Sequence, residues 1–256
     1  MIPAAWRAVA HDYLLAVGEA VSLFIDALRA LKRLPHEGLA TAREFEHLIV
    51  GSLPLTMIVG GFTGAVLGLQ MAYNLERFGA KLYIGDMVSL SLCRELGPVL
   101  TGIVAGGRIG AGITATLGTM AVTEQVDAVR ALGASVAKKL VLPRLLAVVI
   151  GLPLLTAFAD GVGLLGGFLI SVLQFKISPQ FTYNHLFHSL HQRDFFEGLV
   201  KAFCFGIMVL MASVHQGLNV RGGAGGVGFA VTRTVALICI LVLVADFFLT
   251  KLFIMF

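Results

Sequence analysis

Five long apolar runs dominate this sequence of 256 residues and limit what it can fold into. Each is about 20 residues or longer, which is enough to cross the hydrocarbon core of a bilayer as an α-helix. Only 13% of the residues are charged, whereas a soluble domain has about 25%. We therefore predict an all-α integral membrane protein with five transmembrane helices, at residues 49–73, 87–107, 145–173, 195–218 and 234–256.

The first 47 residues carry a different pattern. Apolar side chains recur at alternating three- and four-residue steps over 12–33, with charged residues away from that stripe. This pattern is typical of an amphipathic helix in the membrane interface. The alternative is a helix packed on a soluble part of the protein, but this chain offers little soluble part for it to pack on. Asp12, Glu19 and Asp26 interrupt the core of any cleavable signal peptide. We divide the chain into an N-terminal interfacial region, 1–47, with a short polar segment at its end, and a transmembrane domain, 48–256.

Glycine recurs every four residues in the first apolar run, at Gly60, Gly64 and Gly68. This spacing places the three glycines on one face of a helix, where another helix or a lipid chain can approach closely. A packing face within the chain and an interface between subunits both remain open. We assign to this lipid pocket or packing region Gly60, Gly64, Leu67, Gly68, Leu69 and Tyr73.

Charged residues interrupt the second run near its middle. Arg94 and Glu95 lie at a depth where a charge is costly unless it is paired or reaches water. Neighbours in sequence point about 100° apart on a helix, so we expect each to face a partner helix or a polar cavity. Pro98 cannot donate to the carbonyl of Arg94, which predicts a bend there. An ion network that only fixes packing and a direct role in substrate binding both remain open.

A short polar segment over 121–139 separates the second and third runs. Thr123 is a candidate N-cap, and Glu124 and Asp127 stand where negative charge suits a helix dipole. Gly133 is a candidate terminator. The segment predicts a short helix at 123–132 outside the membrane.

Two further acids lie inside apolar runs. Asp160 is a functional candidate by its depth, although we favour a bond from it to a neighbouring helix. Asp246 interrupts the fifth run in the same way.

The other polar motifs exclude several functions. His185, His188 and His191 are spaced by three and drift around a helix, so no metal site is expected. The three cysteines form no CxxC pair, which argues against a disulfide framework. Residues 222–228, GGAGGVG, lack the Gly-Lys-Ser/Thr of a phosphate loop, and we interpret them as a flexible connector. No motif for nucleophilic catalysis, nucleotide binding or nucleic-acid binding is found.

Basic residues concentrate in 1–47, 108–144 and 221–233. By the positive-inside rule these segments are cytoplasmic. Five spans then place the N-terminus in the cytoplasm and the C-terminus on the far side.

The run RELGPVLTGIVAGGRIGAGITATLGTMAVTEQVDAVRALG at 94–133 resembles the signature of the MlaE/YrbE family, the permeases of Mce-associated lipid ABC transporters. GLPLLTAFAD, VGFAVTRTV and DFFLTKLF are similar to later segments of that family.

The resemblance implies a homodimer in the bacterial inner membrane that moves phospholipid to or from a periplasmic Mce-domain protein, often a hexameric ring, and so serves outer-membrane lipid asymmetry. A cytoplasmic ABC ATPase would bind ATP-Mg and grip the coupling helix of each chain, while this chain would hold no cofactor. Arg94, Glu95 and Pro98 would lie near the lipid cavity. The coupling residues would be Thr123, Glu124, Gln125, Asp127 and Arg130.

We hypothesise that ATP-driven closure pushes this coupling helix and changes the separation of the glycine faces at the dimer axis. Two other classes remain as alternatives: an intramembrane lipid-modifying enzyme using Asp160, Asp246 or the histidines, and a passive channel or scaffold.

Overall fold

The computed structural model describes residues 38–77, 79, 83–188 and 190–255, together with the isolated positions 18, 22, 25, 26 and 29. The predicted interfacial helix at 12–33 lies almost wholly outside the described residues. Within them the chain is helical, and five helical stretches are long and apolar enough to cross a membrane. They span Gly38–Leu75, Ile84–Val122, Ala137–Leu173, Gln192–Leu218 and Gly223–Met255. The prediction of an all-α protein with five transmembrane helices is confirmed, although most of the helices are longer than predicted.

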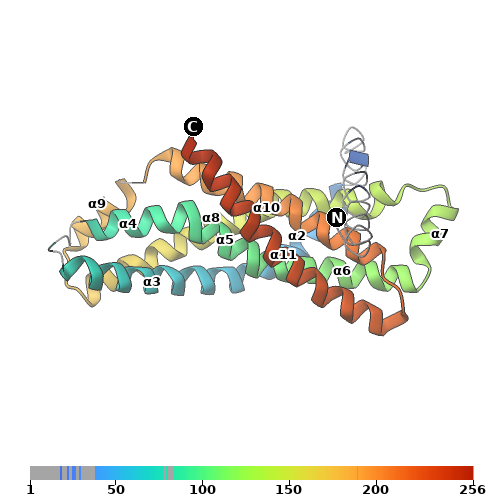
Figure 1. Ribbon diagram of the computed structural model, residues 1–256, viewed down its shortest axis with the longest axis horizontal. Helices are drawn as coiled ribbons and strands as arrows, with labels where there is room; N and C mark the ends of the chain where they lie inside the picture. The colour runs from blue at the N-terminus through green and yellow to red at the C-terminus, as the bar shows by residue number, and fades with distance from the viewer. Residues whose placement is uncertain are drawn as a thin grey trace, which may run out of the picture.

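The helices form an elongated bundle (Figure 1). The short helix α7 lies at one end, and α9 lies at the other. The elements are α2 (Gly38–Leu48), η2 (Val50–Ser52), α3 (Leu53–Arg77), α4 (Ile84–Ser91), η4 (Leu92–Leu96), α5 (Gly97–Leu100), η5 (Thr101–Ala105), α6 (Gly106–Val122), α7 (Gln125–Ala131), η6 (Ala137–Val141), α8 (Leu142–Leu173), α9 (Pro179–His188), α10 (Gln192–Leu218) and α11 (Gly223–Met255).

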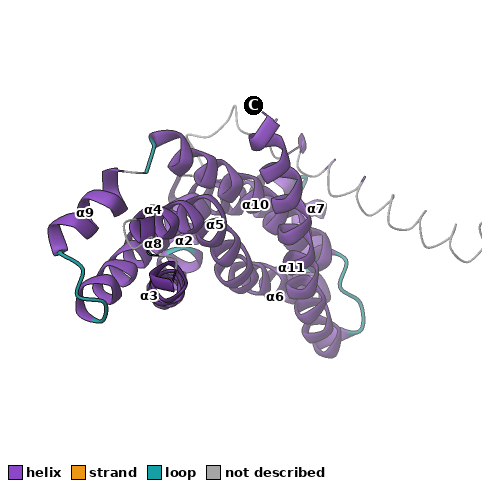
Figure 2. Ribbon diagram, turned by 60° about the vertical axis from the view of Figure 1, so that its left-hand side comes forward, coloured by secondary structure: helices purple, strands orange, loops and turns teal. Residues whose placement is uncertain are grey.

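Helix α8 is the centre of the bundle. It packs along α3 on one side and against α10 on another, and α6 packs against α10 and α11 (Figure 2). Of its most apolar stretch 61% is buried, compared with 28% for the α2–α3 span and 17% for α11. The α2–α3 span and α11 are therefore the spans that this chain buries least.

The second span is continuous from Ile84 to Val122 but irregular around Pro98. Segments η4 and η5, on either side of the proline, are π-helical. Proline removes one backbone donor and crowds the preceding turn, and π-helical turns are a common place for a helix to adjust. The structure thus places the irregularity where the sequence predicts a bend.

Two segments that flank the predicted spans are helical, and for one of them this contradicts a prediction. The polar segment before the first span is the helix α2, which runs into α3 through η2. It is held because Leu48 is buried and because Glu44 pairs with Arg144 of α8 at 2.9 Å. The glycine-rich stretch is not a flexible connector, since α11 already begins at Gly223. Gly222 turns the chain there with a φ of +90°, and the glycines after Gly223 are helical.

Candidate functional site

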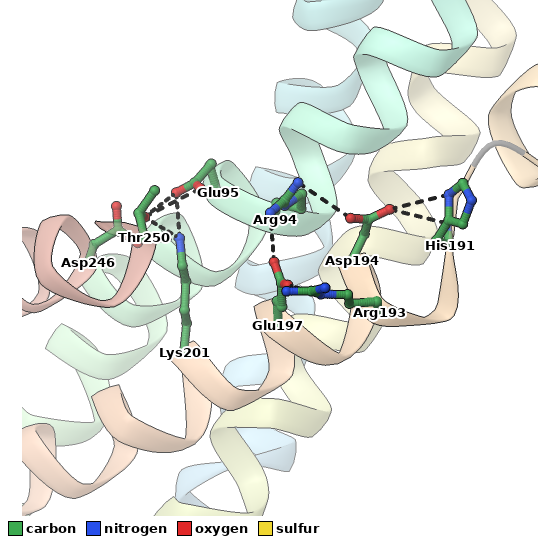
Figure 3. Close-up of polar contacts among 9 residues, drawn as sticks. All are labelled: Arg94, Glu95, His191, Arg193, Asp194, Glu197, Lys201, Asp246 and Thr250. Atoms are coloured by element: carbon green, nitrogen blue, oxygen red, sulfur yellow. Dashed lines mark hydrogen bonds and ion pairs between the residues drawn. The ribbon is translucent and has the colours of Figure 1, made fainter. Parts of the chain in front are cut away.

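The candidate site is a cluster of charged residues on α10, η4 and α11. Arg193, Glu197 and Lys201 follow one another at four-residue steps on α10, so they share one face of that helix. This face is turned toward η4, where Arg94 and Glu95 lie in succession. Figure 3 shows the side chains meeting between the helices.

A close approach of two helices sets the cluster's dimensions. Gly198 of α10 packs against the carbonyl oxygen of Cys93, and a Cβ on Gly198 would also come 3.2 Å from Cγ of Pro98. No side chain can be added at Gly198 without moving η4. This contact brings the charges on α10 within direct reach of those on the second span.

One half of the cluster is centred on Arg94. Its Nη2 donates to Oε2 of Glu197 at 2.7 Å, and its Nη1 lies 3.5 Å from Oδ1 of Asp194. Arg193 donates from Nε to the other oxygen of Glu197 at 2.8 Å. Asp194 also accepts from the backbone N–H of His191 and caps α10. Each carboxylate in this half therefore has a cationic partner.

The other half is centred on Lys201, which is 1% exposed. Its Nζ donates to Oε2 of Glu95 at 2.5 Å and to the hydroxyl of Thr250 at 2.7 Å. It also forms an ion pair with Oδ1 of Asp246 at 2.9 Å. Thr250 in turn donates to Glu95 at 3.1 Å. One ammonium is thus shared by two carboxylates from two different helices.

A cavity of about 270 Å³ opens beside both halves of the cluster. Arg94 and Glu95 reach it with side chains that are 35% and 39% exposed, whereas Lys201 is covered. Its wall also contains apolar residues of α4 and α11. The lining residues are Leu90, Ser91, Arg94, Glu95, Glu197, Lys201, Thr250, Phe253 and Ile254.

The sequence predicts Arg94 and Glu95 near the middle of the second span, but the cluster lies closer to one end of it. The span extends to Val122, so Arg94 is roughly three helical turns, or about 15 Å, from its start at Ile84. Lys201 is at a similar distance from the start of α10. The charges therefore stand inside the end of the bundle that is opposite α7.

Several predictions about single residues can now be settled. Arg94 and Glu95 face partner helices and do not pair with each other, as expected, and Asp246 joins the cluster. Asp160 does not: it is 2% exposed, lies against Gly97, and its Oδ1 has no hydrogen-bond partner among the described residues. The expected bond from Asp160 to a neighbouring helix is wrong.

Sequence reasoning missed the partners on α10 and α11, namely Arg193, Asp194, Glu197 and Thr250. The sequence does contain one signal for these partners. Glu197 and Lys201 are four residues apart at the start of an apolar run, so they lie on one face of the predicted helix.

The glycine face of α3 is a packing face within the chain. Gly60, Gly64 and Gly68 lie against the backbone of Ala159, Gly163 and Gly167 on α8. A Cβ on Gly60 would come 2.5 Å from the carbonyl oxygen of Ala159, so only glycine permits this approach. The hypothesis that these glycines move apart at a dimer axis is therefore wrong.

The other residues assigned to that region divide between two sides of α3. Leu67 is 8% exposed and packs in a core cluster with Leu92 and Val88. Leu69 and Tyr73 are 39% and 55% exposed. The apolar side of α3 that this chain leaves open thus contains Leu69 and Tyr73, and it does not contain the glycines.

The short helix between the second and third spans is α7, and its start differs from the prediction. Thr123 is not its N-cap, since the Thr123 hydroxyl donates to the carbonyl of Thr119 at 2.8 Å and ends α6. Glu124 takes the capping position with a left-handed φ of +61°. Gln125 is the first helical residue, and Asp127 pairs with Arg130 at 2.9 Å on the exposed face.

Helix α7 is exposed on most of its surface. Val126 is buried, while Glu124, Gln125, Asp127 and Arg130 are exposed. Leu132, directly after the helix, is 85% exposed. The end of the protein at α7 therefore presents one apolar side chain beside several charged ones.

The histidines have separate roles. Nδ1 of His185 on α9 lies 2.9 Å from Oδ1 of Asp86 on α4. His191 begins α10 in a capping box with Asp194. The side chain of His188 lies outside the described residues.

Together these features define a multi-pass helical membrane protein with an ionic cluster inside one end and a short exposed helix at the other. Sequence comparison agrees with this class, because the family Permease MlaE matches residues 41–252. The chain belongs to the MlaE permease family and is a membrane transport permease.

Related proteins have similar lengths in bacteria. A probable ABC transporter permease protein of Rickettsia felis is 42% identical over 202 residues, which cover 79% of this chain and 78% of that protein. One from Synechocystis sp. is 38% identical over 199 residues, 78% of this chain and 76% of that protein. The protein TRIGALACTOSYLDIACYLGLYCEROL 1 of Arabidopsis thaliana, a chloroplast protein, is 33% identical over 213 residues, 83% of this chain and 61% of that protein.

Proposed function

We propose that this chain is the membrane subunit of an ABC transporter that moves phospholipid between the inner membrane and a periplasmic Mce-domain protein. The observation that carries the proposal is the single continuous helix from the ionic cluster to α7. Family membership supports the transport class. The lipid in the name of the Arabidopsis relative supports a lipid substrate.

A separate ATPase subunit powers the cycle in this proposal. The sequence has no nucleotide-binding motif, and the bacterial relatives are named as ABC transporter permeases. Helix α7 offers the ATPase a charged face with Asp127 and Arg130 and an apolar tip at Leu132. A groove on the ATPase that covers Leu132 would bury apolar surface at little cost to this chain.

Movement at α7 reaches the cluster through the second span. Helix α6 leads directly from α7 into η5, α5 and η4, where Arg94 and Glu95 lie. The π-helical segments around Pro98 are the place where this span can change its bend. A change there would separate or tighten the pairs of Arg94 with Glu197 and of Glu95 with Lys201. The cavity beside them would open or close to a lipid headgroup.

The lipid chains and a second copy of the protein would use the uncovered apolar surface. Helices α3 and α11 are the least buried of the spans. Leu69 and Tyr73 stand on the open side of α3, away from the packed glycines. In this proposal two copies face each other across these helices, and the lipid tails lie between them.

The orientation follows from the basic residues. The end with α7 carries Arg130, Lys138 and Lys139 and is cytoplasmic by the positive-inside rule. The end with α9 is then periplasmic, next to the Mce-domain partner.

The test is ATP hydrolysis by the complex of this chain with its ATPase, stimulated by phospholipid. We expect Asp127→Lys to abolish the stimulation while the complex still assembles. Glu46→Lys is the matched control, because Glu46 is exposed on α2 and undergoes a similar change of charge. Unchanged stimulation in the Asp127 variant would refute α7 as the coupling element.

A further inference from the structure

A second polar cavity lies between α2, α6 and α8, apart from the ionic cluster. Its volume is about 420 Å³, within the range of small-ligand sites. Leu48 and Ile113 supply an apolar part of the wall, and the hydroxyl of Thr116 and the bare backbone of Gly112 lie beside them. Arg43, Glu44, His47 and Arg144 supply the charged part.

The charges in this cavity favour an anion. Arg144 has a side chain that is 8% exposed and pairs with Glu44 at 2.9 Å, which neutralises one cation. Arg43 and His47 are exposed and form no hydrogen bond or ion pair with the residues that the structure describes. The two arginines outnumber the one glutamate, so Arg43, Arg144 and Glu44 together give the cavity a formal charge of +1.

We place this cavity at the level of the lipid headgroups, because its charged side chains lie next to the ends of apolar stretches. Within the first span, Glu44 and His47 lie just before the apolar stretch that begins at Leu48, and Arg144 lies just before the apolar part of α8. One turn before Gly112 on α6, Arg108 is a further basic residue outside the cavity wall, and its Nη1 donates to the hydroxyl of Ser52 at 2.6 Å. Basic residues at this level attract anionic lipid, and a basic pocket between helices suits a phosphate group.

We propose that this cavity binds the phosphate group of an anionic phospholipid and so fixes α2 against α6 and α8. Arginine binds phosphate oxygens through two parallel N–H donors, and the unpaired guanidinium of Arg43 can do this at the mouth. The phosphate monoanion of a phosphodiester neutralises the net charge. Leu48 and Ile113 contact the glycerol end of the lipid. This site is separate from the transport route and does not depend on it.

The experiment titrates the purified full chain with phosphatidylglycerol or phosphatidylcholine and counts bound lipid by native mass spectrometry. We expect phosphatidylglycerol to bind more tightly. The double variant Arg43→Gln/His47→Gln should weaken its binding about fivefold or more, the effect of one basic residue near a charged membrane surface. Phosphatidylcholine binding should change little.

Two further variants test whether the effect belongs to the cavity. Gly112→Leu should also weaken phosphatidylglycerol binding by filling the space, since a Cβ at Gly112 is accommodated 3.8 Å from Leu48. Arg233→Gln is the matched control, because Arg233 is exposed on α11 away from the cavity. An equal loss of binding in the Arg233 variant would show general surface attraction and overturn the proposal.

A last arm separates lipid from free phosphate. Inorganic phosphate that displaces phosphatidylglycerol, and that stabilises the wild type but not the Arg43 variant, would assign the same site to the free anion. If the wild type and the Arg43/His47 variant bind each lipid and phosphate equally well, the proposed site is refuted.

Discussion

Removing Lys201 should destabilise the protein more than any other single loss of a cation. Its ammonium is almost fully covered and lies within 3 Å of oxygens of Glu95, Asp246 and Thr250. Lys201→Met keeps most of the length of the side chain but removes the ammonium, which leaves two carboxylates without their shared cation. Breaking a buried ion pair in this way costs about 3–5 kcal/mol. Because Glu95 is 39% exposed and can recruit water, we expect the lower value, about 3 kcal/mol.

The assay is thermal unfolding of the purified chain in detergent. A loss of about 3 kcal/mol should lower Tm by roughly 6–12 °C for a chain of this size. Lys251→Met is the matched control, since Lys251 is exposed on α11, and its Tm should remain near the wild-type value.

A triple variant tests the cause of the effect. Lys201→Met combined with Glu95→Gln and Asp246→Asn removes the repelling charges and should recover at least half of the lost Tm. A Lys201→Met variant that unfolds like the wild type, or a triple variant no more stable than Lys201→Met, would refute the reasoning.

The remaining predictions concern single contacts. Gly64→Val should prevent α3 from packing on α8, and so lower Tm strongly or abolish folded protein in expression trials. The control Gly161→Ala, which has open space around its Cβ, should behave like the wild type. Equal Tm values for the two variants would contradict the packing of α3 on α8. Asp160→Ala should leave Tm unchanged or raise it, because it removes a buried polar group without a hydrogen-bond partner, and a large drop in Tm would show a missing partner. Glu197→Gln should slow phospholipid transfer by the reconstituted transporter. Adding Arg94→Gln should cause little further loss, because both changes break the ion pair between Arg94 and Glu197. Additive losses would show that the two residues act separately.

The five spans and their class could be predicted because hydropathy over about 20 residues is a local property of the sequence. That Arg94 and Glu95 need separate partners could also be predicted locally, because a helix directs successive residues about 100° apart. Their partners could not be identified in this way. Glu197 and Lys201 lie more than a hundred residues further along the chain, and one sequence does not show which helices become neighbours.

The errors have physical causes as well. The four-residue spacing of the glycines in α3 is the same whether they pack against α8 or against a second subunit. Only the positions of Ala159 and Gly163 in the structure identify α8 as the partner. The sequence predicts a connector at 222–228, a stretch dominated by glycine, which is a poor helix former. In the structure the positive φ at Gly222 makes the turn, and the following glycines lie within a helix. Thr123 matched the preference for an N-cap, but its hydroxyl bonds backward to α6.

The most direct test of the account is ATP-driven movement of phospholipid by proteoliposomes that contain this chain and its ATPase. We predict that the wild-type complex moves a labelled phospholipid only when ATP is present. The complex with Asp127→Lys should still bind phospholipid and contain its ATPase but should lose this ATP dependence. Equal lipid movement by the chain alone, or full ATP-driven movement by the variant, would contradict the claim that α7 couples a separate ATPase to lipid transport.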